Sequence, residues 1–214
     1  AASDVYKRQK VESECNAMSK IAFIFPGQGA QTAGMGKDFY ENSEAARSFF
    51  DHAQKILDFD LKEMCFGEHE ELNLTEYTQP CMVSVCLAIV QELKKRGINP
   101  DITAGLSLGE YAAVAAAGGM NELDAIKLVR RRGILMQSTV PAGEGAMAAV
   151  LGLDAKKIEE ILESFENVWI ANYNCPGQIV ITGLTNEVQQ ASLALKEAGA
   201  KRVVELKVSG PFHS

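Results

Sequence analysis

The strongest constraint on the fold is a five-residue turn, Gly105-Leu106-Ser107-Leu108-Gly109. Residues 102–104 before it predict a short strand, and the alanine-rich residues 110–117 after it predict a helix. A Gly-x-Ser-x-Gly turn between a strand and a helix forms a nucleophile elbow, whose strained backbone lifts the serine hydroxyl clear of a parallel sheet. The same five-residue pattern arises by chance in plain turns, so the prediction depends on the flanking elements. The sequence therefore predicts an α/β fold in which Ser107 is the nucleophile.

Strands and helices alternate along the chain up to Pro141, as in a mostly parallel sheet covered by helices. Helix ends are recognised from residues that favour N-caps, first positions and C-terminal turns. The predicted elements are a strand at 21–25, a helix capped by Ser43 with Ala46, Phe49, Phe50, Ala53 and Leu57 on its apolar face, a helix that begins at Pro80 and ends at Gly97, and a helix from Asn121 to about Thr139.

The pattern changes after Pro141 to strand, helix, two strands, helix and strand. This βαββαβ order is that of a ferredoxin-like split βαβ unit. The predicted bounds are 146–151, 154–164, 168–173, 178–182, 186–198 and 202–208. We therefore expect a hydrolase-like parallel-sheet domain at 18–143 and 208–214, into which a ferredoxin-like subdomain is inserted at 144–207.

The two ends of the chain look unlike a complete natural protein. Residues 1–17 are polar and lack periodicity, whereas Met18 opens a strand-like run, so we expect 1–17 to be a non-native or disordered leader. The chain stops inside the run Pro211-Phe212-His213-Ser214, which suggests that a C-terminal part of the large domain is missing.

Composition excludes several classes of function. Hydrophobic residues make up 47% of the chain, enough for a packed core, and a net charge of −7 does not favour binding to nucleic acid or to an anionic membrane. No apolar run approaches the roughly 20 residues that a membrane span needs. Five cysteines without CxxC spacing and without a secretory leader predict free thiols in the cytoplasm and no metal site.

A nucleophilic serine needs a base, and the chain holds three histidines. His52 lies in a predicted amphipathic helix, where a surface position is the simpler interpretation. His69 lies in the acidic stretch 68–71, where we expect solvent around it. His213 follows the last predicted strand and a Ser-Gly-Pro bend, so by elimination it is the candidate base for Ser107.

A second glycine-rich segment, Pro26-Gly27-Gln28-Gly29, follows the first predicted strand. A phosphate-binding loop is the competing interpretation, but both the Gly-x-Gly-x-x-Gly pattern and the Lys-Ser/Thr ending of a P-loop are missing. We therefore predict an oxyanion site made by the backbone N–H groups of Gln28 and Leu108.

Seven segments in the same order make the chain from Met18 to Ser214 resemble the malonyl-CoA:acyl-carrier-protein transacylases of fatty-acid synthesis. They are FPGQGAQTAGMG at 25–36, YTQP at 77–80, GLSLGEYAA at 105–113, RGILMQ at 132–137, GAMAAVLGL at 145–153, NCPGQIVITG at 174–183 and VSGPFHS at 208–214.

The resemblance implies a ping-pong acyl transfer from malonyl-CoA to the phosphopantetheine thiol of acyl carrier protein. Ser107 would carry the malonyl group, His213 would move the proton, and Arg132 would pair with the free malonyl carboxylate, because a guanidinium matches carboxylate geometry. The family match alone separates Arg132 from Arg130 and Arg131, which we expect to be solvated. We expect a cytoplasmic monomer with no permanently bound cofactor, which binds neither nucleic acid nor a membrane.

The sequence departs from the family at Leu106, where a histidine usually precedes the serine. We expect Phe212 to narrow the pocket against branched acyl groups, and Asn172 and Asn174 to line a cleft between the subdomains. Three basic clusters are candidates for docking acyl carrier protein: Lys94-Lys95-Arg96, Arg130-Arg131 and Lys201-Arg202. The alternatives that remain are an acyltransferase domain of a polyketide synthase, a serine hydrolase and a non-catalytic binding module.

Overall fold

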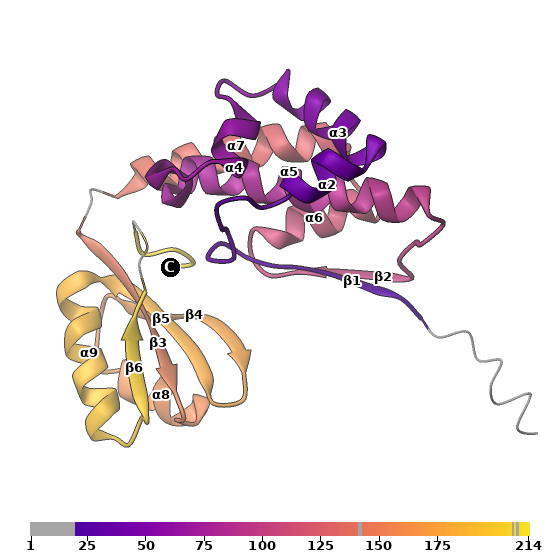
Figure 1. Ribbon diagram of the computed structural model, residues 1–214. Helices are drawn as coiled ribbons and strands as arrows, with labels where there is room; N and C mark the ends of the chain where they lie inside the picture. The colour runs from indigo at the N-terminus through magenta and orange to yellow at the C-terminus, as the bar shows by residue number, and fades with distance from the viewer. Residues whose placement is uncertain (1–19, 141–142, 207, 209) are drawn as a thin grey trace, which may run out of the picture. The chain divides into compact units, whose positions relative to one another are not determined.

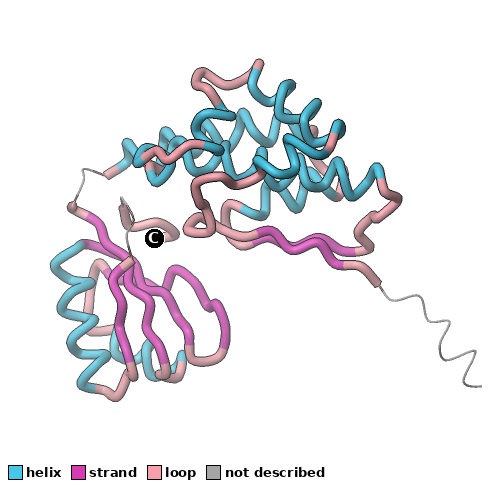
Figure 2. Tube along the Cα trace, in the orientation of Figure 1, coloured by secondary structure: helices cyan, strands magenta, loops and turns pink. Residues whose placement is uncertain are grey.

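The computed structural model describes residues 20–140, 143–206, 208 and 210–214, coloured along the chain in Figure 1 and by secondary structure in Figure 2. Met18 and the predicted leader lie outside these residues. The chain divides into two compact units, one made of residues 20–67 and Met82–Lys127, the other of Glu68–Cys81 and Leu128–Ser214. Within the described residues no helix is long and apolar enough to cross a membrane.

The first unit contains the predicted parallel pair of strands. Strand β1 (Ala22–Phe25) runs parallel to β2 (Ile102–Gly105), with Ala22 opposite Ile102 and Phe25 opposite Gly105. Helix α6 (Gly109–Ala116) follows β2 and packs on both strands. The strand–turn–helix order around Ser107 is therefore confirmed.

Three short helices precede α5 in this unit: α2 (Lys37–Asn42), α3 (Glu44–Gln54) and α4 (Leu61–Phe66). Ser43 caps α3 as predicted, because its Oγ accepts the Ala46 N–H at 3.1 Å while donating to Glu92 Oε2 at 2.5 Å. The four predicted apolar residues from Ala46 to Ala53 are buried. Leu57 lies beyond the end of the helix, contrary to the prediction, because the chain after Gln54 tightens into i→i+3 hydrogen bonds.

Helix α5 (Thr75–Lys95) begins five residues earlier than predicted, so the placement of Pro80 at its first position was wrong. Proline inside a helix removes the hydrogen bond to the carbonyl four residues before it, here that of Glu76. Arg130 Nη1 donates to this carbonyl oxygen at 2.8 Å. A side chain from a distant segment thus replaces the missing donor and allows the helix to start at Thr75.

The second unit has the predicted βαββαβ order, which follows helix α7 (Glu122–Thr139) along the chain. Residues Glu122–Lys127 of this helix belong to the first unit, and the rest belong to the second. All strand pairs in its sheet are antiparallel, in the order β4-β5-β3-β6 (Figure 1). The elements are β3 (Gly145–Leu151), α8 (Ala155–Leu162), β4 (Val168–Cys175), β5 (Gln178–Leu184), α9 (Thr185–Glu197), β6 (Arg202–Glu205) and, earlier in the chain, the short 3₁₀ helix η1 (Glu70–Asn73).

Both faces of this sheet carry buried apolar residues. Helices α8 and α9 cover one face, where Val150, Ile181 and Leu195 belong to a single buried cluster. On the other face, Met147, Ala149 and Val180 are packed by residues that follow β6, among them Phe212. The apolar alternation along β3 and β5 therefore holds the helices on one side and the C-terminal segment on the other.

Substitutions at two leucines of α9 test how much this core contributes to the free energy of unfolding. Replacing the fully buried Leu195 by alanine should lower the free energy of unfolding by about 2–5 kcal/mol, because it removes apolar contacts and leaves a cavity. The same substitution at Leu193, which is 60% exposed, is the matched control and should change it by no more than about 0.5 kcal/mol. Equal effects of the two substitutions in urea unfolding would contradict this packing.

Candidate active site

Ser107 has the strained backbone that the elbow pattern predicts. Its φ is 50°, in the left-handed region that non-glycine residues rarely adopt. A Cβ on Gly105 would lie 2.1 Å from the carbonyl carbon of Gly109, and a Cβ on Gly109 would lie 2.3 Å from the Phe25 carbonyl oxygen. Both flanking glycines are therefore needed for α6 to approach the two strands this closely.

The predicted oxyanion residues lie in the same unit as Ser107. Leu108 is fully buried and immediately precedes α6, so its N–H has no acceptor inside the helix and lies at the positive end of the helix dipole. Gly27 packs against the elbow, since a Cβ there would lie 2.9 Å from the Leu106 carbonyl oxygen. The loop that carries Gln28 is thus held beside the serine turn.

Leu106, the departure from the family pattern, takes part in this packing through its backbone. Its N–H donates to the Phe25 carbonyl oxygen at 3.1 Å, while its side chain is 53% exposed. Because the backbone makes the contacts that hold the turn, a leucine at this position is compatible with the elbow.

Arg132 and His213 both belong to the second unit. His213 is the second non-glycine residue with a positive φ, 61°. Partial burial lowers the pKa of its imidazole, and the positive charge of Arg132 lowers it further, since both disfavour the imidazolium. The structure therefore brings the candidate base and the candidate carboxylate-binding residue into electrostatic contact. The pairing of Ser107 with His213 joins the two units and stays a prediction.

A close contact fixes the segment that ends in His213. A Cβ on Gly145, at the start of β3, would lie 2.1 Å from Pro211 Cδ, so only glycine lets the proline ring pack there. Phe212 packs on the sheet face formed by Met147, Ala149 and Val180. This packing sets the direction in which the chain presents His213.

The three consecutive arginines of α7 differ in their surroundings. Arg131 is exposed and Arg132 is partly buried. Arg130 is held by Glu76 and stacks over the Tyr77 ring, 4.9 Å from its centroid. The expectation that Arg130 is solvated was therefore wrong, because Pro80 creates an unpaired carbonyl that attracts it.

Two further polar residues near the start of α5 were not singled out from the sequence. Glu76 pairs with Arg130 at 3.2 Å. Gln79 is fully buried; its Nε2 lies 3.2 Å from Met136 Sδ, and its Oε1 has no hydrogen bond among the described residues. Pro80 was the sequence signal for the Glu76–Arg130 pair. It lies four residues after Glu76 and cannot donate the regular helical hydrogen bond to the Glu76 backbone carbonyl.

His52 is exposed on α3, as the sequence predicted, whereas His69, which precedes η1, is partly buried and not simply surrounded by solvent. Asn172 and Asn174 lie on β4, where the pairing with β5 is irregular, and their predicted place in a cleft stays a prediction. Across the described ranges, no three His, Cys, Asp or Glu side chains group so as to hold a metal ion.

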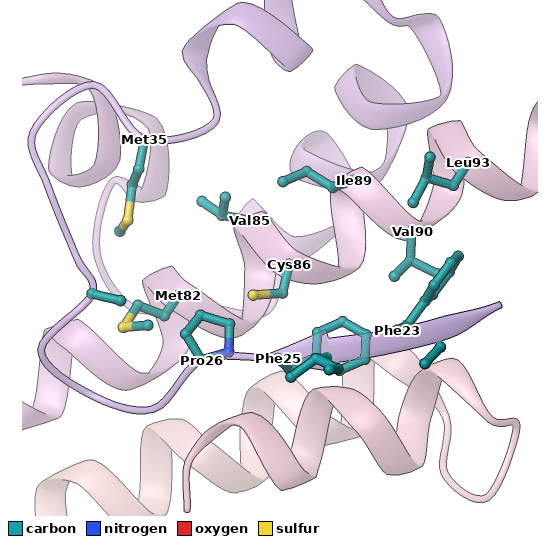
Figure 3. Close-up of a pocket in the computed structure, with 13 residues that line it drawn as sticks. Phe23, Phe25, Pro26, Met35, Met82, Val85, Cys86, Ile89, Val90 and Leu93 are labelled. Atoms are coloured by element: carbon teal, nitrogen blue, oxygen red, sulfur yellow. The ribbon is translucent and has the colours of Figure 1, made fainter. Parts of the chain in front are cut away.

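Cys86 is a second nucleophilic side chain in the first unit. It lines an apolar cavity of about 410 Å³ between β1 and α5, together with Phe25, Met82 and Ile89 (Figure 3). Burial raises the pKa of the Cys86 thiol to about 11, so the thiol stays protonated and unreactive near neutral pH. None of the four cysteines within the described residues forms a disulfide, as predicted.

The strained elbow and the two sheets define the class of this chain, an α/β protein with a serine elbow of the kind used in acyl chemistry. Residues 22–214 match the family described as the acyl transferase domain, and the chain belongs to that family.

Similar proteins carry more specific names. The malonyl CoA-acyl carrier protein transacylase of Bacillus subtilis strain 168 is 50% identical over 202 residues, which are 92% of this chain and 64% of that protein. A crystal structure of the enzyme of the same name from Clostridium perfringens has a TM-score of 0.87 at 43% identity, over 91% of this chain and 63% of that one. A malonyl-transacylase in complex with a type II PKS acyl-carrier protein has a TM-score of 0.86 at 40% identity. The match covers 90% of this chain and 64% of that one. The chain thus spans slightly less than two thirds of these relatives.

Replacing Arg132 by alanine should raise the pKa of His213 from its lowered value towards the ordinary value of about 6.5. The sign follows because the nearby positive charge disfavours the imidazolium, and its removal makes protonation easier. An NMR titration of the His213 ring would measure the shift, with exposed Arg131→Ala as the control. An unchanged His213 pKa in Arg132→Ala would show that the two groups do not interact.

Proposed function

We propose that this chain carries out acyl transfer in a malonyl-CoA:acyl-carrier-protein transacylase, moving the malonyl group from malonyl-CoA to the phosphopantetheine thiol of acyl carrier protein. The observation that carries the proposal is the serine elbow, with φ of 50° at Ser107, in a chain of the acyl transferase domain family. The names of the relatives support the choice of malonyl group and carrier protein.

In the proposed first step, Ser107 Oγ attacks the thioester carbonyl carbon while His213 takes the hydroxyl proton. The resulting oxyanion accepts hydrogen bonds from the N–H groups of Gln28 and Leu108. The carbon–sulfur bond then breaks, His213 returns the proton to the departing thiolate, and the malonyl group remains on Ser107 as an ester. In the second step the carrier thiol attacks this ester, and the proton passes from the thiol through His213 to Ser107.

The lowered pKa of His213 suits this role. A base must be neutral to accept the serine proton, and both partial burial and the charge of Arg132 keep the imidazole neutral to a lower pH than usual. Arg132 would also bind the malonyl carboxylate through two parallel hydrogen bonds. The negative carboxylate would offset the Arg132 charge once substrate is bound, which would make the imidazole of His213 more basic during the reaction.

The finer description of the fold belongs to the same proposal. We propose a hydrolase-like parallel-sheet domain at 18–143 and 208–214, with a ferredoxin-like subdomain inserted at 144–207. The parallel pair β1-β2 supports the parallel-sheet domain, and the strand order β4-β5-β3-β6 supports the ferredoxin-like subdomain. A cytoplasmic monomer without a resident cofactor, which uses malonyl-CoA as substrate, completes the proposal.

Incubation of the complete protein with labelled malonyl-CoA tests the reaction. We expect stable label on Ser107 that leaves when holo acyl carrier protein is added, because the acyl group is held as an ester until a thiol attacks. Ser107→Ala should take up no label, whereas Ser138→Ala, which changes an exposed serine of α7, should label normally. Rapid release of free malonate without carrier protein would instead identify a serine hydrolase.

A second experiment tests the carboxylate site. Arg132→Ala should reduce kcat/KM for malonyl-CoA relative to acetyl-CoA by about 10- to 100-fold, the range expected when a charge-assisted hydrogen-bonded pair worth about 1.5–3 kcal/mol is lost. The ratio can be measured for acylation of Ser107 alone, so that carrier-protein docking does not contribute. Arg131→Ala is the control, and an unchanged ratio in Arg132→Ala would remove Arg132 from this role.

A further inference from the structure

One face of helix α7 is fastened to the first two turns of helix α5 by residues from both helices. Arg130, Gly133 and Gln137 lie three and four residues apart on α7 and therefore share a face. Each of them contacts Thr75 or Glu76 at the start of α5. All of these residues belong to the second unit.

Arg130 makes the most extensive of these contacts. Its Nη1 donates to the Glu76 carbonyl oxygen at 2.8 Å and to Glu76 Oε2 at 3.2 Å, and its guanidinium lies 4.9 Å from the centroid of the Tyr77 ring. The side chain of Arg130 is only 13% exposed and that of Glu76 is 28% exposed. This is a partly buried pair with a fixed orientation, unlike a surface ion pair.

The backbone contact of Arg130 follows from Pro80. Without an N–H at Pro80, the Glu76 carbonyl lacks its regular helical donor four residues further on. A buried carbonyl without a hydrogen bond is costly, so this group favours a donor from outside the helix. Among the three consecutive arginines, only Arg130 shares the docked face with Gly133 and Gln137.

The other two contacts make the helix approach close and directional. A Cβ on Gly133 would lie 2.7 Å from the Thr75 carbonyl oxygen and 2.8 Å from Glu76 Cα, so the two backbones nearly touch. The Thr75 N–H donates to Gln137 Oε1 at 3.1 Å. With these contacts α7 can neither slide along α5 nor turn about its own axis without losing hydrogen bonds.

Arg132 lies beside this docked face and is not part of it. At about 100° per residue, it is rotated by about 200° from Arg130 and by about 100° from Gly133 around the helix axis. Once the docked face is fixed, the direction in which Arg132 leaves the helix is fixed as well. The charge of Arg132 also lowers the pKa of His213, which places the guanidinium within electrostatic range of the candidate base.

We propose that Arg130 is a positioning residue for Arg132: by clamping α7 to the Pro80-interrupted start of α5, it holds the Arg132 guanidinium where a carboxylate-bearing acyl group binds. The inference rests on the proposed function of Arg132. Positioning matters here because a two-point guanidinium–carboxylate pair tolerates little displacement, of the order of 0.5 Å.

The test compares acylation of Ser107 by malonyl-CoA and by acetyl-CoA in the complete protein carrying Arg130→Ala, Arg130→Lys, Arg131→Ala or Arg132→Ala. We expect Arg130→Ala to reduce the malonyl-to-acetyl ratio of kcat/KM about tenfold, mainly through a higher KM for malonyl-CoA, since misplaced binding groups reduce productive binding. Arg130→Lys should restore the ratio only in part, because an ammonium reaches one acceptor without the planar fork. Arg131→Ala, at an exposed position, should leave the ratio unchanged.

The ratio separates positioning from general stabilisation. Partial unfolding of Arg130→Ala would lower the rates for both acyl-CoA substrates equally and leave their ratio as it was, so a constant ratio with a lower melting temperature would overturn the inference. If Arg132→Ala also keeps the ratio, the proposed role of Arg132 fails. If Arg132→Ala loses malonyl preference while Arg130→Ala retains it, the positioning role alone is wrong.

Discussion

The close approach of helix α6 to strands β1 and β2 is the constraint on which the serine site depends. The backbone distances at Gly105 and Gly109 leave no room for a side chain, so the turn between them must be sharp. Such a turn places Ser107 in the left-handed region, a strain of roughly 1–3 kcal/mol that the packing of the surrounding strands and helix must offset. The same close packing brings the Gly27 loop against the Leu106 carbonyl. One geometric requirement therefore fixes the positions of Ser107, the N-terminus of α6 and the Gly27 loop relative to one another.

The packing of the second unit depends on a different kind of constraint. A proline that lacks an N–H and glycines that lack a Cβ determine which segments can pack against each other. Pro80 leaves the Glu76 carbonyl without a donor, and Arg130 supplies one. Gly133 and Gly145 each remove a Cβ so that Thr75 and Pro211, respectively, can come close. These contacts hold the elements that carry Arg132 and His213. Burial lowers the pKa of His213 and the positive charge of Arg132 lowers it further, which favours the neutral imidazole, the form that proton abstraction requires.

Local signals in the sequence predicted local structure well. The Ser43 cap, the elbow glycines and the βαββαβ order each depend on residues a few positions apart, and each is confirmed. The predicted start of α5 at Pro80 was wrong. The donor to the Glu76 carbonyl comes from Arg130, which lies 50 residues after Pro80 and leaves no trace in the local pattern. The short helices α2 and α4 have six residues each, too few for a periodic pattern to emerge. The lowered pKa of His213 likewise arises from burial and from a charge on another element.

The three consecutive arginines Arg130, Arg131 and Arg132 have different surroundings because they leave the helix in different directions. Successive residues point about 100° apart, so adjacent arginines cannot share one environment. Arg130 lies on the face that meets α5, where a carbonyl, a carboxylate and an aromatic ring surround it. Arg131 is exposed, and Arg132 is partly buried within electrostatic reach of His213. From the sequence, Arg130-Arg131 was one of three basic clusters considered as candidates for docking acyl carrier protein. The partial burial of Arg130 against Glu76 argues against that interpretation, because a charge already paired with a carboxylate contributes little to steering a distant one.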